Sequence, residues 1–300
     1  RPSGGVGHLF RFALRLQQAR YVDAATDLQW LHDHEPDRFQ KALSIVATFR
    51  NNDAFLDQAM PRLWSLGTVL GRQFEAKRPD LVERMARALR DRPMRERAPI
   101  EAVRGVMYAY RGHRAEADKI ATQLLLAPET RADGWRIQGH VLWTTAGKAW
   151  EAHVLFADLC QTGKNIDDCI MAVHTIKDAH RPREALVYLS RHKDQLLMTT
   201  TAAAQYWSVM AKAHLEMHNY EEATTAARSA YGLAKNDVNI ALLLAETLGH
   251  VGQHEEERAL LTKLHEQNPR HPAVLEMMRR VEDGLPPELR SLPVEVSRTR

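Results

Sequence analysis

The chain has 300 residues, of which 44% are hydrophobic and 26% charged, a composition that can bury a core and excludes wholesale disorder. Forty-one lysines and arginines against 38 aspartates and glutamates leave a net charge of +3, and this excess is spread too evenly to form a nucleic-acid-binding patch. Two cysteines exclude a disulfide-dense scaffold, and no stretch approaches the roughly 20 consecutive apolar residues of a membrane span.

The first residues, Arg1-Pro2-Ser3, include no methionine, and no signal peptide or transit segment follows them. The sequence leaves open whether a leader has been removed or the chain is a piece of a longer protein. Strand signals are nearly absent along the whole chain, because apolar and polar residues do not alternate for long and β-branched runs are short. Helical spacing dominates instead.

Short amphipathic helices are predicted along most of the chain. In residues 206–215, for example, Tyr206, Val209, Met210 and Ala213 recur at steps of three and four, which is the spacing of one helix face. Residues that break helices interrupt this pattern at close intervals, so each helix is predicted to have about 12 to 15 residues. The breakers are Gly112, Pro128, Gly147, Gly163, Pro182, Asn219, Gly252 and Pro269.

A small residue recurs just inside an acidic or polar helix start and marks an internal repeat. The intervals from Ala117 to Ala152, Ala185, Ala223 and then Glu257 are 35, 33, 38 and 34 residues. A period of about 34 residues that is sustained over five units predicts stacked helix pairs.

These residues resemble the tetratricopeptide repeat (TPR) family. Residues 204–237 match its pattern with Trp207, Met210-Ala211, His214 in place of the usual Tyr, Ala223 and Ala227. Residues 238–271 match with Ala241, Leu244-Ala245, Leu248, Gly252, Leu261 and Pro269, and residues 98–131 match with Gly105, Tyr108, Gly112, Ala117 and Ala121. The resemblance implies an all-α, right-handed superhelical solenoid of antiparallel helix pairs. It indicates no particular partner, because the motif positions are packing positions.

The resemblance divides the chain into five predicted segments. They are a first TPR-like helix pair in 1–36, degenerate TPR-like units in 37–97, regular TPR-like repeats in 98–271, a capping helix in 272–283 and an extended, proline-containing tail in 284–300. Residues 166–203 exceed the period by four residues, which predicts a longer second helix or loop through Met198–Thr201.

The two cysteines, Cys160 and Cys169, flank a polar segment that contains Gly163 and Asn165, so they could face one another across a turn between helices. We interpret them as two unpaired, half-buried thiols. The alternative is a disulfide, which would favour an oxidising compartment. The compartment itself stays open, with the cytoplasm favoured slightly over the periplasm.

Catalytic chemistry is not indicated. His214 and His218 lie four apart, which would place both on one helix face, but the metalloprotease pattern needs a glutamate directly after the first histidine and Leu215 stands there. We interpret both as ordinary core or surface histidines rather than metal ligands. No nucleophile elbow, phosphate-binding glycine loop or dinucleotide fingerprint occurs. The sequence therefore predicts no enzyme, cofactor or metal.

In TPR proteins the first helix of each pair lines a concave surface that commonly binds peptides or helices, and the resemblance implies such a groove here. The expected lining is apolar with isolated charges, which suits an extended or amphipathic polypeptide segment. The alternative is a solvated inner wall without a ligand. The eleven residues that the register places in the groove are Ile137, Val141, Thr144, Ile170, His174, Lys177, Ser208, Lys212, Leu215, Leu242 and Glu246.

The sequence thus predicts a non-catalytic scaffold or adaptor that binds a protein or peptide partner, with no nucleic acid, no membrane span and an undetermined oligomeric state. One alternative is a helical periplasmic module of a bacterial envelope export or assembly machine. A metal-dependent hydrolase is a weaker alternative.

Overall fold

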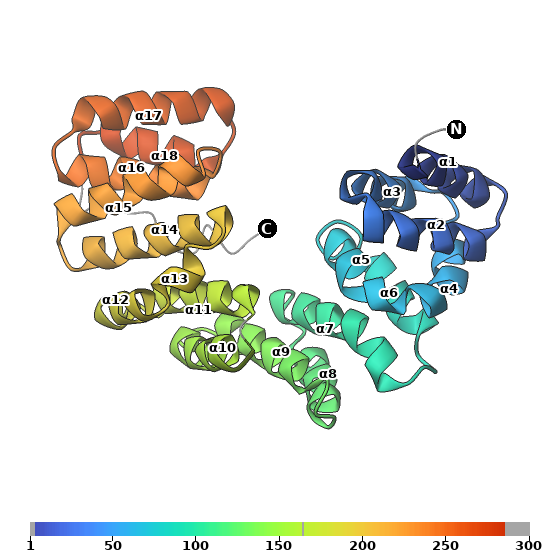
Figure 1. Cartoon of the computed structure of the whole chain (residues 1–300). Helices are drawn as coiled ribbons and strands as arrows, with labels where there is room; N and C mark the ends of the chain where they lie inside the picture. Colours follow the sequence, from blue (N-terminus) through green and yellow to red (C-terminus); the bar gives the residue numbers. More distant parts are fainter. Residues whose placement is uncertain (1–3, 164, 286–300) are drawn as a thin grey trace. The chain divides into compact units, whose positions relative to one another are not determined.

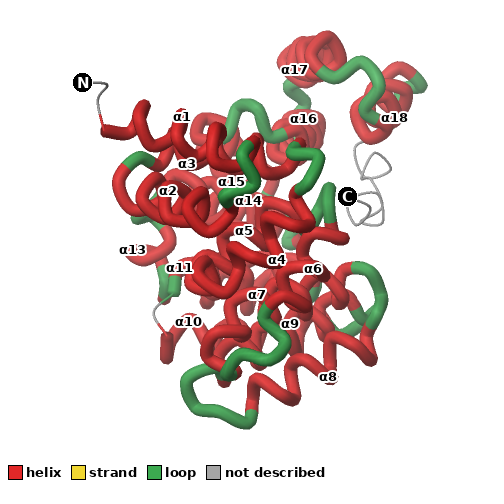
Figure 2. The backbone as a smooth tube through the Cα atoms, turned by 90° about the vertical axis from the view of Figure 1, so that its right-hand side faces the viewer, coloured by secondary structure: helices red, strands yellow, loops and turns green. Residues whose placement is uncertain are grey.

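The computed structural model describes residues 4–163 and 165–285, and within these ranges the chain consists of helices joined by turns and short loops, without a strand (Figures 1 and 2). The helices gather into two compact units, which divide between Thr144 and Thr145. No helix in the described ranges has the length and apolar character needed to cross a membrane.

The first unit is built from nine α-helices and one 3₁₀ turn in its described part. These are α1 (Gly4–Gln17), α2 (Tyr21–His34), α3 (Pro36–Thr48), α4 (Asn52–Leu63), η1 (Trp64–Leu66), α5 (Gly67–Phe74), α6 (Pro79–Ala88), α7 (Met94–Tyr110), α8 (Arg114–Leu125) and α9 (Arg131–Thr144). Helix α1 packs on α2, α7 on α8, and α8 on α9.

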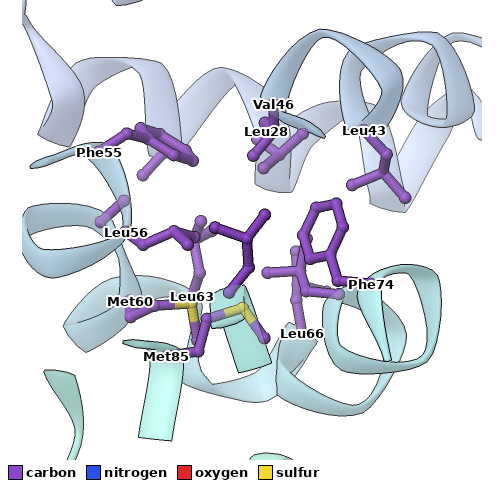
Figure 3. Close-up of a cluster of buried hydrophobic side chains, with 14 of the residues drawn as sticks. Leu28, Leu43, Val46, Phe55, Leu56, Met60, Leu63, Leu66, Phe74 and Met85 are labelled. Carbon is purple, nitrogen blue, oxygen red and sulfur yellow. The ribbon is translucent and has the colours of Figure 1, made fainter. Parts of the chain in front are cut away.

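A large apolar core cluster occupies the N-terminal part of the first unit. Side chains from α2, α3, α4, η1, α5 and α6 meet in it, among them Leu28, Leu43, Phe55, Phe74 and Met85, which are all buried (Figure 3). Burial of large aliphatic and aromatic side chains is the main favourable term in folding, so this cluster stabilises the residues that the sequence identified only as degenerate repeats.

One buried carboxylate fixes α1 against α2. Asp27 accepts a hydrogen bond from Nη1 of Arg15 at 2.6 Å, and its other oxygen lies 2.7 Å from Nδ1 of His8. The ring of His8 stacks on Trp30, with 3.9 Å between the ring centroids. A buried carboxylate needs such partners, because desolvation of an unpaired charge is costly.

The second unit continues with helix pairs. Its helices are α10 (Ala149–Gly163), α11 (Ile166–Asp178), α12 (Pro182–Arg191), α13 (Lys193–Leu196), α14 (Thr200–Glu216), α15 (Tyr220–Leu233), α16 (Val238–His250), α17 (His254–Gln267) and α18 (Pro272–Glu282). Each helix packs on its neighbour along the chain, as α10 does on α11 and α14 on α15.

Local signals set the helix boundaries in the second unit. The side chain of Asn165 accepts a hydrogen bond from the N–H of Asp167 at the start of α11, and Asp237 caps α16 in the same way. Gly252 has a φ of +77° in the turn between α16 and α17, a conformation that glycine adopts without steric cost.

The prediction of an all-α, TPR-like arrangement of helix pairs is confirmed for the described residues. The anchor residues occupy similar environments, since each lies within a helix and is fully or almost fully buried. They are Ala117 in α8, Ala152 in α10, Ala185 in α12, Ala223 in α15 and Glu257 in α17. A small side chain at these points lets two helix backbones approach closely.

The five predicted segments stay predictions. Helix α18 covers most of the segment expected as a cap, 272–283. Of the expected tail, Pro286 and all later residues lie outside the described part of the chain. The four extra residues, expected at Met198–Thr201, lie earlier in the chain, where they form the short additional helix α13. Thr199 instead caps the N-terminus of α14, because its hydroxyl oxygen accepts a hydrogen bond from the N–H of Ala202.

The interpretation of Cys160 and Cys169 as free thiols was wrong, because the structure joins them in a disulfide. The bridge connects the C-terminal part of α10 to the first turn of α11, and both residues are buried. Gln195 in α13 donates a hydrogen bond from Nε2 to Sγ of Cys169. The pairing depends on the close approach of two helix ends, which residue spacing alone does not determine.

Candidate functional site

The structure divides the eleven predicted groove residues between the two units. Ile137, Val141 and Thr144 belong to α9 in the first unit. Ile137 and Val141 are buried in an apolar core cluster, where Ile137 fills the space that a side chain at Gly105 in α7 would need. They have no surface to offer a ligand and act as packing residues. Thr144, the last residue of α9, is exposed.

The other eight residues belong to the second unit. They come from three successive first helices, and α14 packs against both α11 and α16 (Figure 1). All but the buried Leu242 are partly exposed. We call this surface the α11–α14–α16 face, and its residues are Ile170, His174, Lys177, Ser208, Lys212, Leu215, Leu242 and Glu246.

Two lysines meet on the α11–α14–α16 face. Burial lowers the pKa of Lys177, the neighbouring Asp178 opposes that shift, and the like charge of Lys212 lowers the pKa further. Nζ of Lys177 lies 4.0 Å from Oδ1 of Asp178. Lys212 makes no ion pair with any residue in the described ranges. A small hollow between α11 and α14 is lined by both lysines.

A neutral histidine accompanies these ammonium groups. Burial, and secondly the charge of Lys177, lower the pKa of His174 to about 4, so this imidazole is uncharged at neutral pH. The face therefore offers apolar surface from Ile170 and Leu215 beside two partly desolvated positive charges. Such a surface can bind a polypeptide segment that presents a carboxylate between apolar side chains.

The structure shows a second site that sequence reasoning missed, a surface cavity between α10 and α12. Its volume is about 490 Å³, and its walls are mainly apolar. We call it the α10–α12 cavity, and its apolar lining comprises Trp150, Val154, Ala157, Val187 and Tyr188. Charged residues at its rim include Asp158 on α10 and Arg183 and Arg191 on α12.

Four rings run along the wall of this cavity. His153 lies between Trp150 and Tyr188, with centroid distances of 5.2 Å and 5.0 Å, and His192 lies 4.4 Å beyond Tyr188. Nδ1 of His153 donates a hydrogen bond to the carbonyl of Ala172, and burial lowers the pKa of both histidines. The wall is therefore uncharged at neutral pH, which suits an apolar ligand.

One sequence signal could have revealed the cavity. Val154 and Val187 each lie two positions after an anchor alanine, Ala152 and Ala185. The corresponding residues of the other units, which are also exposed, are Lys119, Thr225 and Ala259. A bulky apolar side chain occupies this solvent-facing position only in the two units that form the cavity.

The expectation that His214 and His218 share a helix face was wrong. Helix α14 ends at Glu216, and His218 follows in a turn with a φ of +60°. Its Nδ1 lies 2.9 Å from the hydroxyl of Tyr220. The helical spacing on which a two-histidine metal site would depend is therefore missing.

No family model matches the chain, and no curated protein matches its sequence. Among solved structures, the crystal structure of the APC/C hetero-tetramer Cut9-Hcn1 aligns with 86% of this chain and 63% of that chain, at 11% sequence identity and a TM-score of 0.34. This chain thus spans less than two thirds of the length of that protein. Similarity at this level transfers no function, so the proposals below rest on the residues of this chain.

Proposed function

We propose that the chain is a non-catalytic interaction scaffold, and that its second unit binds a polypeptide segment of a partner protein along the α11–α14–α16 face. The observation that carries this proposal is the pair of half-buried lysines, Lys177 on α11 and Lys212 on α14, which line the same small hollow. A fold of stacked helix pairs provides an extended surface of this kind without a reactive centre.

The chemistry of the face indicates the kind of segment. Asp178 lies 4.0 Å from Lys177, whereas Lys212 has no carboxylate within ion-pair distance in the described ranges, so an anion from a partner would reduce the repulsion between the two lysines. A glutamate, aspartate or C-terminal carboxylate of the partner would make charge-assisted hydrogen bonds, each of which contributes about 1.5–3 kcal/mol. Ile170 and Leu215 would contact apolar side chains on either side of that carboxylate.

A peptide-selection experiment tests this function. Random peptides displayed on phage are selected on the immobilised wild-type chain, and the enriched peptides are assayed against a Lys177→Glu/Lys212→Glu variant. We expect acidic residues to be enriched and affinity to fall at least tenfold, which corresponds to about 1.4 kcal/mol. A Lys193→Glu/Lys263→Glu variant, which makes the same charge change at two exposed positions of the second unit, is the matched control.

Two results would contradict the proposal. One is that the selected peptides bind the Lys177→Glu/Lys212→Glu variant as tightly as the wild type. The other is that the control variant loses affinity to the same extent, because the effect would then come from net charge and not from this face.

The disulfide favours a second candidate function, a helical module of a bacterial envelope export or assembly machine. Disulfides persist in oxidising compartments such as the periplasm and are rare in the cytosol. The bridge between Cys160 and Cys169 supports a location outside the cytosol. Alkylating free thiols at the moment of cell lysis, followed by fractionation, tests this candidate; a fully alkylated chain in the cytosolic fraction would contradict it.

A further inference from the structure

We propose that the α10–α12 cavity is a second interaction site, which takes the apolar stripe of an amphipathic helix from a partner protein. This helix carries acidic side chains on the flank facing α12 and basic side chains on the flank facing α10. The inference does not rest on the proposed function, because the α10–α12 cavity and the α11–α14–α16 face lie on different helices and share no residue.

The first argument is that the apolar surface of the cavity is not required for packing. Val154 is 52% exposed and Val187 is 50% exposed, although both line the cavity. The equivalent position in the other units holds Lys119, Thr225 or Ala259, so the fold itself does not demand a valine there. Two exposed valines that meet at one hollow indicate a surface that another molecule covers.

The second argument is a buried polar group without a partner. Tyr188 is only 7% exposed, it lines the cavity, and its hydroxyl has no hydrogen-bond partner among the residues that the structure describes. Buried polar groups are normally hydrogen-bonded, because leaving one unpaired is unfavourable. A polar side chain within the partner's apolar stripe can provide that hydrogen bond.

The dimensions and walls of the cavity favour a helix over an extended strand. On α10 the lining runs from Trp150 to Gln161 and on α12 from Arg183 to Arg191, which correspond to about 17 Å and 12 Å, or about three and two helical turns. An anchoring set at positions i, i+3, i+4 and i+7 spans about 10 Å and therefore fits within this length. An extended strand would need hydrogen-bond partners for its backbone, and the walls are two helices whose backbone groups are already bonded internally.

The charges at the rim define the flanks of the partner helix. Asp158 stands on the α10 side, while Arg183 and Arg191 stand on the α12 side. None of the three forms an ion pair with a residue in the described ranges. Glu184, also on α12, is already paired with Arg181 at 3.7 Å. The rim is thus acidic along α10 and basic along α12, and it is complementary to a helix with one basic and one acidic flank.

Fluorescence anisotropy with a designed probe tests the inference. The probe is a fluorescein-labelled helical peptide with leucines at i, i+3, i+4 and i+7, glutamates on one flank and lysines on the other; a scrambled peptide of the same composition is the control. We expect saturable binding to the wild type and at least tenfold weaker binding to a Val154→Asp/Val187→Asp variant. A Leu233→Asp variant, at a similarly exposed residue of α15, should bind like the wild type.

The rim charges give an independent readout. An Asp158→Lys variant has unpaired basic side chains on both sides of the cavity and should prefer a second peptide with glutamates on both flanks, which reverses the preference of the wild type. If Val154→Asp/Val187→Asp does not fold, an Arg183→Glu/Arg191→Glu variant replaces it, and its affinity for the mixed-flank probe must fall.

Several results would overturn the inference. One is the absence of saturable binding of the probe to the wild type at millimolar concentration. Another is that the wild type binds the scrambled peptide as tightly as the probe. A third is that the Val154→Asp/Val187→Asp variant binds the probe as tightly as the wild type does. Sedimentation that shows a wild-type dimer dissociated by the same two substitutions would assign the cavity to a second copy of the chain instead. If the Lys177→Glu/Lys212→Glu variant lost binding of the probe, the probe would bind the α11–α14–α16 face and not the cavity. If that face proved to bind no peptide while the probe still bound the cavity, the inference would stand.

Discussion

Opening the disulfide should destabilise the second unit while leaving its helices in place. The bridge between Cys160 and Cys169 closes a loop with a sequence separation of 9 residues. On the chain-entropy model, a loop of this length restricts the unfolded state by roughly 2.5 kcal/mol at 25 °C. With a urea dependence of about 2 kcal/mol per molar, the unfolding midpoint of the second unit should fall by roughly 1 M on reduction.

Urea unfolding followed by circular dichroism, with and without a phosphine reductant, measures this shift on a single sequence. A Cys160→Ala/Cys169→Ala variant should behave like the reduced wild type and should not respond to the reductant. Since both cysteines lie in the second unit, hydrogen exchange in the first unit is an internal control and should not change. Coincident unfolding curves for the oxidised and reduced protein, or two free thiols in the untreated protein, would refute the reasoning.

Three further substitutions probe packing and charge. Asp27→Ala should cost the first unit roughly 3 kcal/mol of unfolding free energy, because Arg15 and His8 lose their buried acceptor; an unchanged urea midpoint would contradict this. Ala223→Leu should cost about 1–3 kcal/mol by overpacking a fully buried anchor position, whereas a wild-type midpoint would show that the site has room. Burial and secondly Arg72 lower the pKa of His140 to about 4, below the unfolded value of about 6.5. The unfolded state therefore binds the extra proton, and stability should fall by up to about 3 kcal/mol between pH 6.5 and pH 4; a His140→Gln variant should lack this component in urea titrations across that range.

The repeat architecture could be predicted from the sequence because its packing requirement is local and recurs. At Ala152, Ala185 and Ala223 a helix approaches its neighbour, and the same requirement for a small side chain appears about once per period. Glu257 shows the limit of that signal, since a buried carboxylate lies at the equivalent place and contacts Gly249. The repeat pattern predicts where two helices approach each other closely. It does not predict which side chain lies there, because this depends on the residues of the neighbouring helix.

The candidate site could be predicted only in part, because the register gives the direction of a residue but not what covers it. Ile137 has the expected position on α9, yet Gly105 on α7 leaves a space that its side chain fills, so the residue is buried. Lys177 and Lys212 keep partial exposure, because the contacts between α11 and α14 leave a small hollow there. The pairing of the two cysteines likewise depends on the approach of helix ends, which no local pattern encodes.

Binding sites on a repeat fold are best sought where a solvent-facing position departs from its equivalents, and the two valines of the α10–α12 cavity illustrate why. A buried position is constrained by packing, so an apolar residue there says nothing about partners. An exposed position is free of that constraint, and since threonine serves at Thr225, exchanging Val154 and Val187 for threonine should change the free energy of unfolding by no more than about 0.5 kcal/mol. The same exchange replaces one methyl group by a hydroxyl on each wall of the cavity and so reduces its exposed apolar surface. A variant that keeps its stability but loses helix binding would therefore separate the residues that build the fold from those that serve an interaction, whereas a large loss of stability would show that the valines belong to the core.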